Sequence, residues 1–85
     1  MAYRIFLRPA AVRDLNSLQG DVRERIEQAI DRLAENPRPH GSKKLVGFEN
    51  EWRLRVGEYR VLYVIDDATK RVTIARVAHR REAYR

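Results

Sequence analysis

The chain reads WRLRVGEYRVLY from Trp52 to Tyr63. Apolar and cationic residues alternate around Gly57-Glu58, which is typical of two half-buried strands joined by a two-residue turn. Such a turn fixes the strand register and places Arg55 directly opposite Arg60. Because side chains alternate between faces, one face carries the apolar set of Trp52, Leu54, Val56, Tyr59, Val61 and Tyr63. The stretch therefore predicts a β-hairpin with one apolar and one cationic face.

The cationic face carries Arg53, Arg55 and Arg60. Like charges directly opposite each other destabilise a sheet, so the Arg55–Arg60 pair indicates a site for a bridging anion. Guanidinium groups match phosphate oxygens in a two-pronged geometry. A solvated charged face is the alternative interpretation. The net charge of +6 makes nucleic acid the leading partner, ahead of an acidic protein or a membrane surface.

Length and composition limit the possible classes of protein. Eighty-five residues predict a single domain over residues 1–85. A hydrophobic content of 44% and a charged content of 35% fit a globular protein with a thin core. The absence of cysteine excludes a disulfide framework and thiol chemistry. No apolar run approaches a membrane span and no signal-peptide pattern begins the chain, so we expect a cytoplasmic protein with no membrane partner.

The first part of the chain predicts a strand followed by a helical hairpin. Alternation favours a strand over residues 3–8, and Pro9 suits the first position of a helix that Gly20 ends. Asp21 and Glu24 resemble a capping box for a second helix. That helix carries an apolar stripe of Val22, Ile26, Ala29, Ile30 and Leu33. A proline-containing segment then ends it.

The second part of the chain predicts strands. Residues 40–50 read as a loop or a weak edge strand, and residues 71–78 as the last strand after a turn at 66–70. The length of that turn is open, and one residue of slip exchanges the faces of Arg76 and Val77. The expected fold is α+β: a strand, a helical hairpin, and a three-stranded antiparallel meander forming a small twisted sheet with both helices on one face.

The side-chain inventory restricts the chemistry. There are two histidines and no acidic cluster at ligand spacing, so we expect neither a metal nor another cofactor. RNA supplies its own nucleophile, the 2′-hydroxyl, and needs a protein to position the backbone, stabilise phosphorane charge and move two protons. Arginines suit the first two tasks. His79 and Tyr84 are the candidates for proton transfer, and the residues alone do not decide between them.

Three motifs resemble the RelE branch of the RelE/ParE toxin superfamily. They are Lys44-Leu45-x-Gly47, the hairpin pattern WRLRxGxYRxxY, and VAHRREAY at residues 77–84. The resemblance covers almost the whole chain and implies a RelE-like fold. It implies a type II toxin–antitoxin toxin that cuts mRNA in the ribosomal A site without a metal and so inhibits translation. The implied partners are the ribosome, mRNA and a cognate antitoxin, which forms a hetero-oligomeric complex with the toxin.

The resemblance also assigns roles to residues. It implies that Arg55, Arg60, Arg80 and Tyr84 are catalytic, with Arg60 stabilising the transition-state phosphate. It implies that Arg53 binds RNA. Further contacts to RNA or to ribosomal backbone are expected from Lys43, Lys44, His79 and Arg81. Arg80 and Arg81 also fit an ordinary solvated tail.

Two other functions stay open. A ParE-like toxin shares the fold but inhibits DNA gyrase, and such proteins generally lack the basic and tyrosine set present here. The other alternative is a catalytically weak module that binds an antitoxin or nucleic acid. The family's best-studied pattern has lysines where this chain has Arg53 and Arg55, which keeps this alternative in view.

Overall fold

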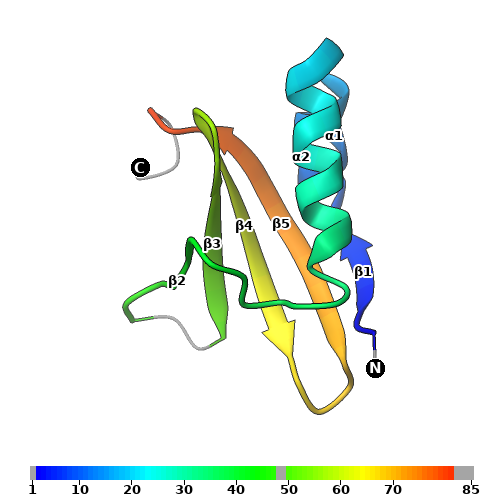
Figure 1. Ribbon diagram of the computed structural model, residues 1–85, viewed down its shortest axis with the longest axis vertical. Coiled ribbons are helices and arrows are strands. Elements are labelled where there is room, and N and C mark those ends of the chain that lie inside the picture. The colour runs from blue at the N-terminus through cyan, green and yellow to red at the C-terminus, as the bar shows by residue number, and fades with distance from the viewer. Residues whose placement is uncertain (1, 48–49, 82–85) are drawn as a thin grey trace.

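The computed structural model describes residues 2–47 and 50–81. Their elements are β1 (Arg4–Leu7), α1 (Pro9–Asn16), α2 (Gly20–Arg32), β2 (Ser42–Lys44), β3 (Glu51–Val56), β4 (Tyr59–Asp66) and β5 (Arg71–His79). These strands form a five-stranded sheet in the order β1-β5-β4-β3-β2, in which β1 runs parallel to β5 and the other neighbours are antiparallel. Both helices lie on one side of the sheet (Figure 1), so the predicted α+β fold is confirmed.

The central hairpin has the predicted register. Arg55 pairs with Arg60 and Arg53 with Leu62. The turn residue Gly57 has a φ of +59°, a left-handed conformation that glycine adopts without strain. The predicted edge strand is also present, because β2 pairs with β3 along the outer side of the hairpin.

The core lies between the sheet and the two helices. The strands contribute Leu54, Val61, Tyr63, Ile65, Val72, Ile74 and Val77, and the helices contribute Ala11, Leu15, Ile26 and Ile30, with Leu33 at the C-cap of α2. Val22 belongs to the predicted stripe but is 39% exposed. It lies in the first turn of α2 and lines a small hollow beside Val56 and Tyr59.

The predicted boundary between the helices is wrong. α1 already ends at Asn16, and Ser17 caps it through its backbone N–H. Gly20, with a φ of +62°, begins α2 and does not end α1. The residue before it, Gln19, is the N-cap and makes no side-chain capping hydrogen bond, so the capping box is not formed. The left-handed conformation of Gly20 redirects the chain from the short connection to the start of α2.

A register shift in β5 decides which residues face the core. Leu62 pairs with Arg76 but Tyr63 pairs with Ile74, so Ala75 is the extra residue of a β-bulge. An uninterrupted strand would alternate Ile74 and Arg76 on the core face. The bulge instead places Val77, which is 4% exposed, in the core and Arg76 on the other face.

The free edge of β5 is covered by a carboxylate of α1. β1 pairs with β5 only up to Ile74. Beyond that point, Asp14 Oδ2 accepts hydrogen bonds from the Val77 backbone N–H and from Arg76 Nε, each at 2.8 Å. Burial raises the pKa of Asp14, but these two hydrogen bonds and the charges of Arg76 and Arg13 outweigh it, and the net pKa is lowered.

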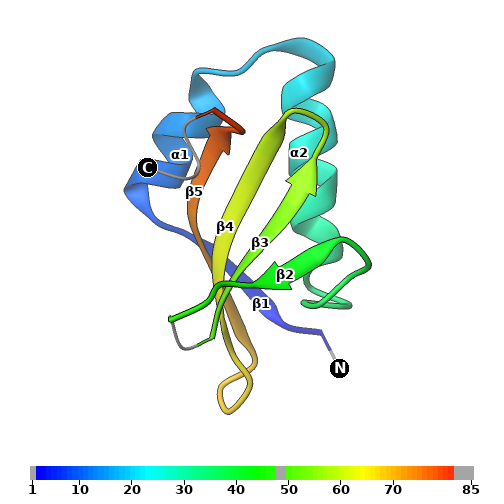
Figure 2. The same ribbon diagram turned by 90° about the vertical axis from the view of Figure 1, so that its left-hand side faces the viewer.

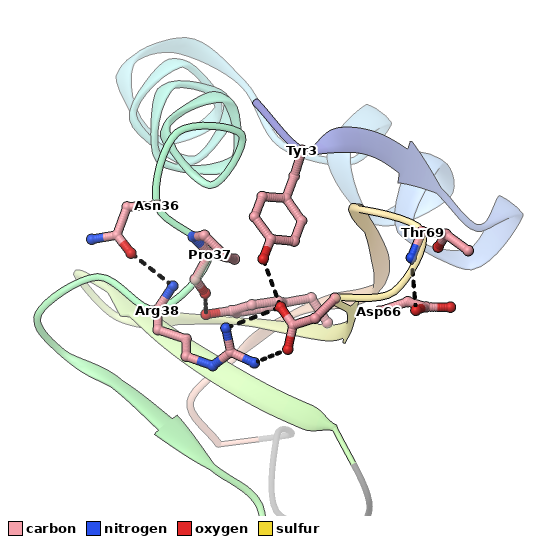
Figure 3. A network of polar contacts seen from close by, with 8 residues as sticks. Tyr3, Asn36, Pro37, Arg38, Asp66 and Thr69 are labelled. Carbon is pink, nitrogen blue, oxygen red and sulfur yellow. Dashed lines mark hydrogen bonds and ion pairs between the residues drawn. The ribbon is translucent and has the colours of Figure 1, made fainter. Parts of the chain in front are cut away.

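A polar network joins three segments at the end of the sheet away from the Gly57 turn (Figure 3). Asp67, in the β4–β5 turn, accepts a hydrogen bond from Tyr3 Oη at 2.6 Å and an ion-paired one from Arg38 at 2.8 Å. These hydrogen bonds, of which the one from Arg38 has the larger effect, lower the pKa of Asp67 to about 2. Beside them, buried Tyr63 donates to the Pro37 carbonyl, and burial raises its pKa to about 12. The network ties the segment after α2 to the sheet.

Substitution of Asp14 tests its role at the edge of β5. Asp14→Ala leaves the Val77 N–H without this acceptor, and the free energy of unfolding should fall by about 1–3 kcal/mol. Asp14→Asn keeps an acceptor oxygen and should lose less. The measurement is urea unfolding at neutral pH, and equal midpoints for Asp14→Ala and the wild type would contradict the assignment.

The same interaction gives a pH dependence. Because folding lowers the pKa of Asp14, its stabilisation is fully present above the ordinary value of 3.8 and is lost as the pH falls through the lower native value. The wild type should therefore lose its advantage over Asp14→Ala below about pH 4. Urea unfolding as a function of pH measures the difference, and a constant gap down to strongly acidic pH would rule this out.

Candidate functional site

Four cationic side chains surround a small hollow on the sheet face opposite the helices. Figure 2 looks onto this face, with both helices behind the sheet. The hollow has a volume of about 100 Å³ and is lined by Gly41, Lys43, Arg53, Arg55 and Arg60. We call the space lined by these five residues the arginine hollow. Strand pairing creates it, because Lys43 lies opposite Arg53 and Arg55 lies opposite Arg60.

Arg60 is the electrostatic centre of this face. Burial lowers its pKa from the usual value, and the charges of Arg55, Arg53 and Arg80 lower it further, while Glu58 offsets part of the effect. An arginine stays protonated in proteins at neutral pH. The lowered pKa therefore reflects burial first and the neighbouring positive charges second, and a bound anion would offset the repulsion between those charges.

Arg80 lies close enough to the arginine hollow for its charge to act on Arg60, a placement that the sequence leaves open. Its backbone N–H donates to the Glu58 carbonyl at 2.7 Å, and its Nε lies 3.4 Å from Glu58 Oε2. The two side chains are 50% and 56% exposed, so the ion pair is weak and open to competition from another anion. The sequence does not by itself identify Glu58 as part of the site. Its position in the hairpin turn, between two strands that carry arginines, is the feature that could have indicated this role.

Other predicted residues lie away from the arginine hollow. His79 pairs with Tyr59 in the sheet and meets its ring edge-on at 5.3 Å between centroids, so it shares the face opposite Arg60. Lys44 pairs with Trp52 and alternates to the face opposite Lys43. Arg81 is exposed, and its backbone N–H donates to His79 Nδ1 at 3.3 Å. Tyr84 lies outside the described residues.

The arrangement can bind a phosphate and stabilise charge that develops on it. Arginines supply fixed donors but do not exchange protons at neutral pH. Within residues 2–47 and 50–81, no three His, Asp or Glu side chains are grouped so as to hold a metal ion. Within the same residues, neither helix has the length and apolar character needed to cross a bilayer.

Comparisons with known proteins agree on one family. Residues 5–84 match the family described as the ParE toxin of the type II toxin–antitoxin system parDE. The toxin RelE of Mycobacterium tuberculosis is 33% identical over 84 residues, which cover 98% of this chain and 87% of that protein. Relatives that were crystallised in complex with an antitoxin have the same fold.

Two such structures are similar over nearly the full chain. The archaeal RelE–RelB complex from Pyrococcus horikoshii contains a chain with a TM-score of 0.84 and 30% identity, covering 98% of this chain and 100% of that one. The RelB–RelE antitoxin–toxin complex from Methanococcus jannaschii gives a TM-score of 0.73 and 29% identity, with coverages of 93% and 94%. The chain therefore belongs to the RelE/ParE toxin superfamily, as a type II toxin–antitoxin toxin of the RelE family.

Proposed function

We propose that this toxin is a metal-independent, ribosome-dependent endoribonuclease that cuts mRNA in the A site and so inhibits translation. The observation that carries the proposal is the arginine hollow, in which Arg60 is crowded by neighbouring guanidinium groups. Such a site favours a phosphodiester, and most of all one that gains negative charge in a transition state.

The proposed mechanism uses the nucleophile of the substrate. The 2′-hydroxyl of the RNA attacks the adjacent phosphorus, the 5′-oxygen of the next nucleotide leaves, and the charge builds up on the phosphoryl oxygens between these two events. Arg60 and Arg55 face each other across the hairpin and would hold those oxygens. Arg80 would exchange its ion pair with Glu58 for a contact to the same group. Tyr84 is the proposed proton-transfer group.

The proposed binding residues surround this centre. Lys43 and Arg53 line the arginine hollow and would hold the phosphate backbone beside the cut. His79, Lys44 and Arg81 lie outside the hollow, so they would contact RNA or ribosomal backbone at other points. The proposed catalytic residues remain Arg55, Arg60, Arg80 and Tyr84.

The proposed protein partner is a cognate antitoxin. The relatives from Pyrococcus horikoshii and Methanococcus jannaschii were both crystallised with RelB. We infer that this toxin likewise forms a hetero-oligomeric complex with its antitoxin in the cytoplasm, and that the complex silences it.

Inhibition of DNA gyrase is the second candidate function. The match to a family described as ParE toxin favours it. The two functions are separated by adding the purified protein to programmed ribosomes and, in parallel, to gyrase with relaxed plasmid. Cut mRNA with normal supercoiling supports the ribonuclease, and intact mRNA with lost supercoiling supports gyrase inhibition.

Removal of Arg60 should abolish cleavage. Arg60→Gln takes away a fixed donor to the transition-state charge, and the rate of mRNA cleavage on ribosomes should fall by about 100-fold or more. Arg80→Gln should act in the same direction. Arg8→Gln is the matched control, because Arg8 is an exposed arginine at the start of α1 and lies outside the hollow. Primer extension measures the rate, and full cleavage by both Arg60→Gln and Arg80→Gln would refute the assignment.

Removal of the Glu58 carboxylate should tighten RNA binding. Glu58→Gln frees Arg80 from a weak ion pair and removes a negative charge that acts on Arg60. We expect the Kd for single-stranded RNA to fall by a few-fold, about the value of one exposed ion pair. Fluorescence anisotropy at low salt measures it, with Glu24→Gln on α2 as the control. A Kd for Glu58→Gln that is equal to or higher than that of the wild type would mean that Glu58 does not compete with RNA.

A further inference from the structure

A second hollow lies between α2 and the outer edge of β3. Its volume is about 480 Å³. Three arginines line it, Arg25 and Arg32 from α2 and Arg55 from β3, together with His40. Its described lining contains no Asp or Glu, and part of its floor is apolar. We call this the α2–β3 groove, defined by Arg25, Ala29, Arg32, Arg55 and Val56.

Local sequence places these side chains together. Arg25, Ala29 and Arg32 stand at positions i, i+4 and i+7 of α2, so they share one helical face. On the strand side, β2 pairs with β3 only from Trp52 to Leu54. Arg55 and Val56 therefore lie beyond the end of β2, where among the described residues no strand covers the edge of β3.

The groove and the arginine hollow are adjacent. Arg55 lines both, so one side chain stands at the boundary between them. Arg25 extends from α2 toward the hairpin turn, where its Nη2 lies 3.6 Å from the position that a Cβ on Gly57 would take. A chain of guanidinium groups thus runs from Arg60 over Arg55 to Arg25 and Arg32.

The chemistry of the groove suits a nucleotide. Guanidinium groups bind phosphate oxygens and also stack on base planes. The apolar surface of Ala29 and Val56 can accept the face of a base. A volume of about 480 Å³ lies within the range of pockets for small ligands and is large enough for one nucleotide.

We propose that the RNA strand bound at the arginine hollow continues over Arg55 into the α2–β3 groove, where Arg25 and Arg32 hold the nucleotide next to the cut. The proposal rests on the proposed ribonuclease function and extends its substrate-binding site to α2. A single RNA strand suits two adjacent cationic sites that share Arg55, because its phosphates repeat at regular intervals.

The test compares RNA binding by groove variants. Arg25→Gln and Arg32→Gln each remove one phosphate contact, so the Kd for a fluorescent oligouridylate of about ten nucleotides should rise. The slope of log Kd against log salt should flatten by about 0.7 for each variant and by about twice that for the double variant. Arg23→Gln is the matched control on the same helix, because Arg23 pairs with Glu27 outside the groove. Its slope should equal that of the wild type.

Ligand length provides a second readout. Dimethyl phosphate, a phosphodiester without nucleosides, is small enough for the arginine hollow of about 100 Å³. Arg25→Gln and Arg32→Gln should therefore leave its Kd unchanged, whereas Arg60→Gln should raise it. If the decamer binds the groove variants with wild-type Kd and slope, the proposal is wrong. It is also wrong if the variants lose binding of poly-glutamate but not of RNA, since the groove would then accept an acidic polypeptide.

The proposed role of the groove and the proposed ribonuclease function can be rejected independently. Ribosome-dependent cleavage by the wild type together with unchanged RNA binding by the groove variants would reject the groove alone. Absence of cleavage by the wild type would reject the ribonuclease function, whatever the groove binds. Thermal unfolding of each variant confirms that a change in Kd does not come from a loss of fold.

Discussion

Arg55 and Arg60 face each other across two hydrogen-bonded strands, and this like-charge pair is the constraint on which the site depends. The pair cannot separate by a change of register, because a one-residue slip would carry Leu54, Val61 and Tyr63 out of the core. Hydrophobic burial on one face therefore maintains electrostatic repulsion on the other. Such a pre-set cluster needs no rearrangement when charge develops on a bound phosphate.

The hairpin, the order of elements and the cationic face could all be predicted, because each depends on contacts between residues close in sequence. The two-residue turn at Gly57-Glu58 fixes the pairs on both strands, and alternation then fixes the faces. The sequence does not distinguish the edge strand over 42–44 from a loop, since three residues carry little pattern. The sequence does not fix the boundary between α1 and α2, because a glycine fits equally well after one helix or before the next.

Long-range packing decides the remaining features. The bulge at Ala75 sets the faces of the residues after it, and its only sequence signal is the shift of apolar positions from 72 and 74 to 77. The closeness of Arg80 to Arg60 depends on that bulge and on the contact with Glu58. The α2–β3 groove depends on how α2 packs over the edge of the sheet, and no local sequence pattern predicts that packing. Tyr84 lies outside the described residues, and its role stays a prediction.

The chemistry of the cut RNA ends distinguishes attack by the RNA's own 2′-hydroxyl from attack by water. Arginines that stabilise attack by the 2′-hydroxyl leave a 2′,3′-cyclic phosphate, or the phosphate formed when it opens, and a 5′-hydroxyl on the other fragment. The measurement is mass spectrometry of the fragments of a defined mRNA cut by the purified toxin on ribosomes, after removal of loosely held metals from the toxin. The wild type should leave cyclic phosphate and 5′-hydroxyl ends. Fragments with a 3′-hydroxyl and a 5′-phosphate would contradict it, because water, and not the RNA itself, would then be the nucleophile.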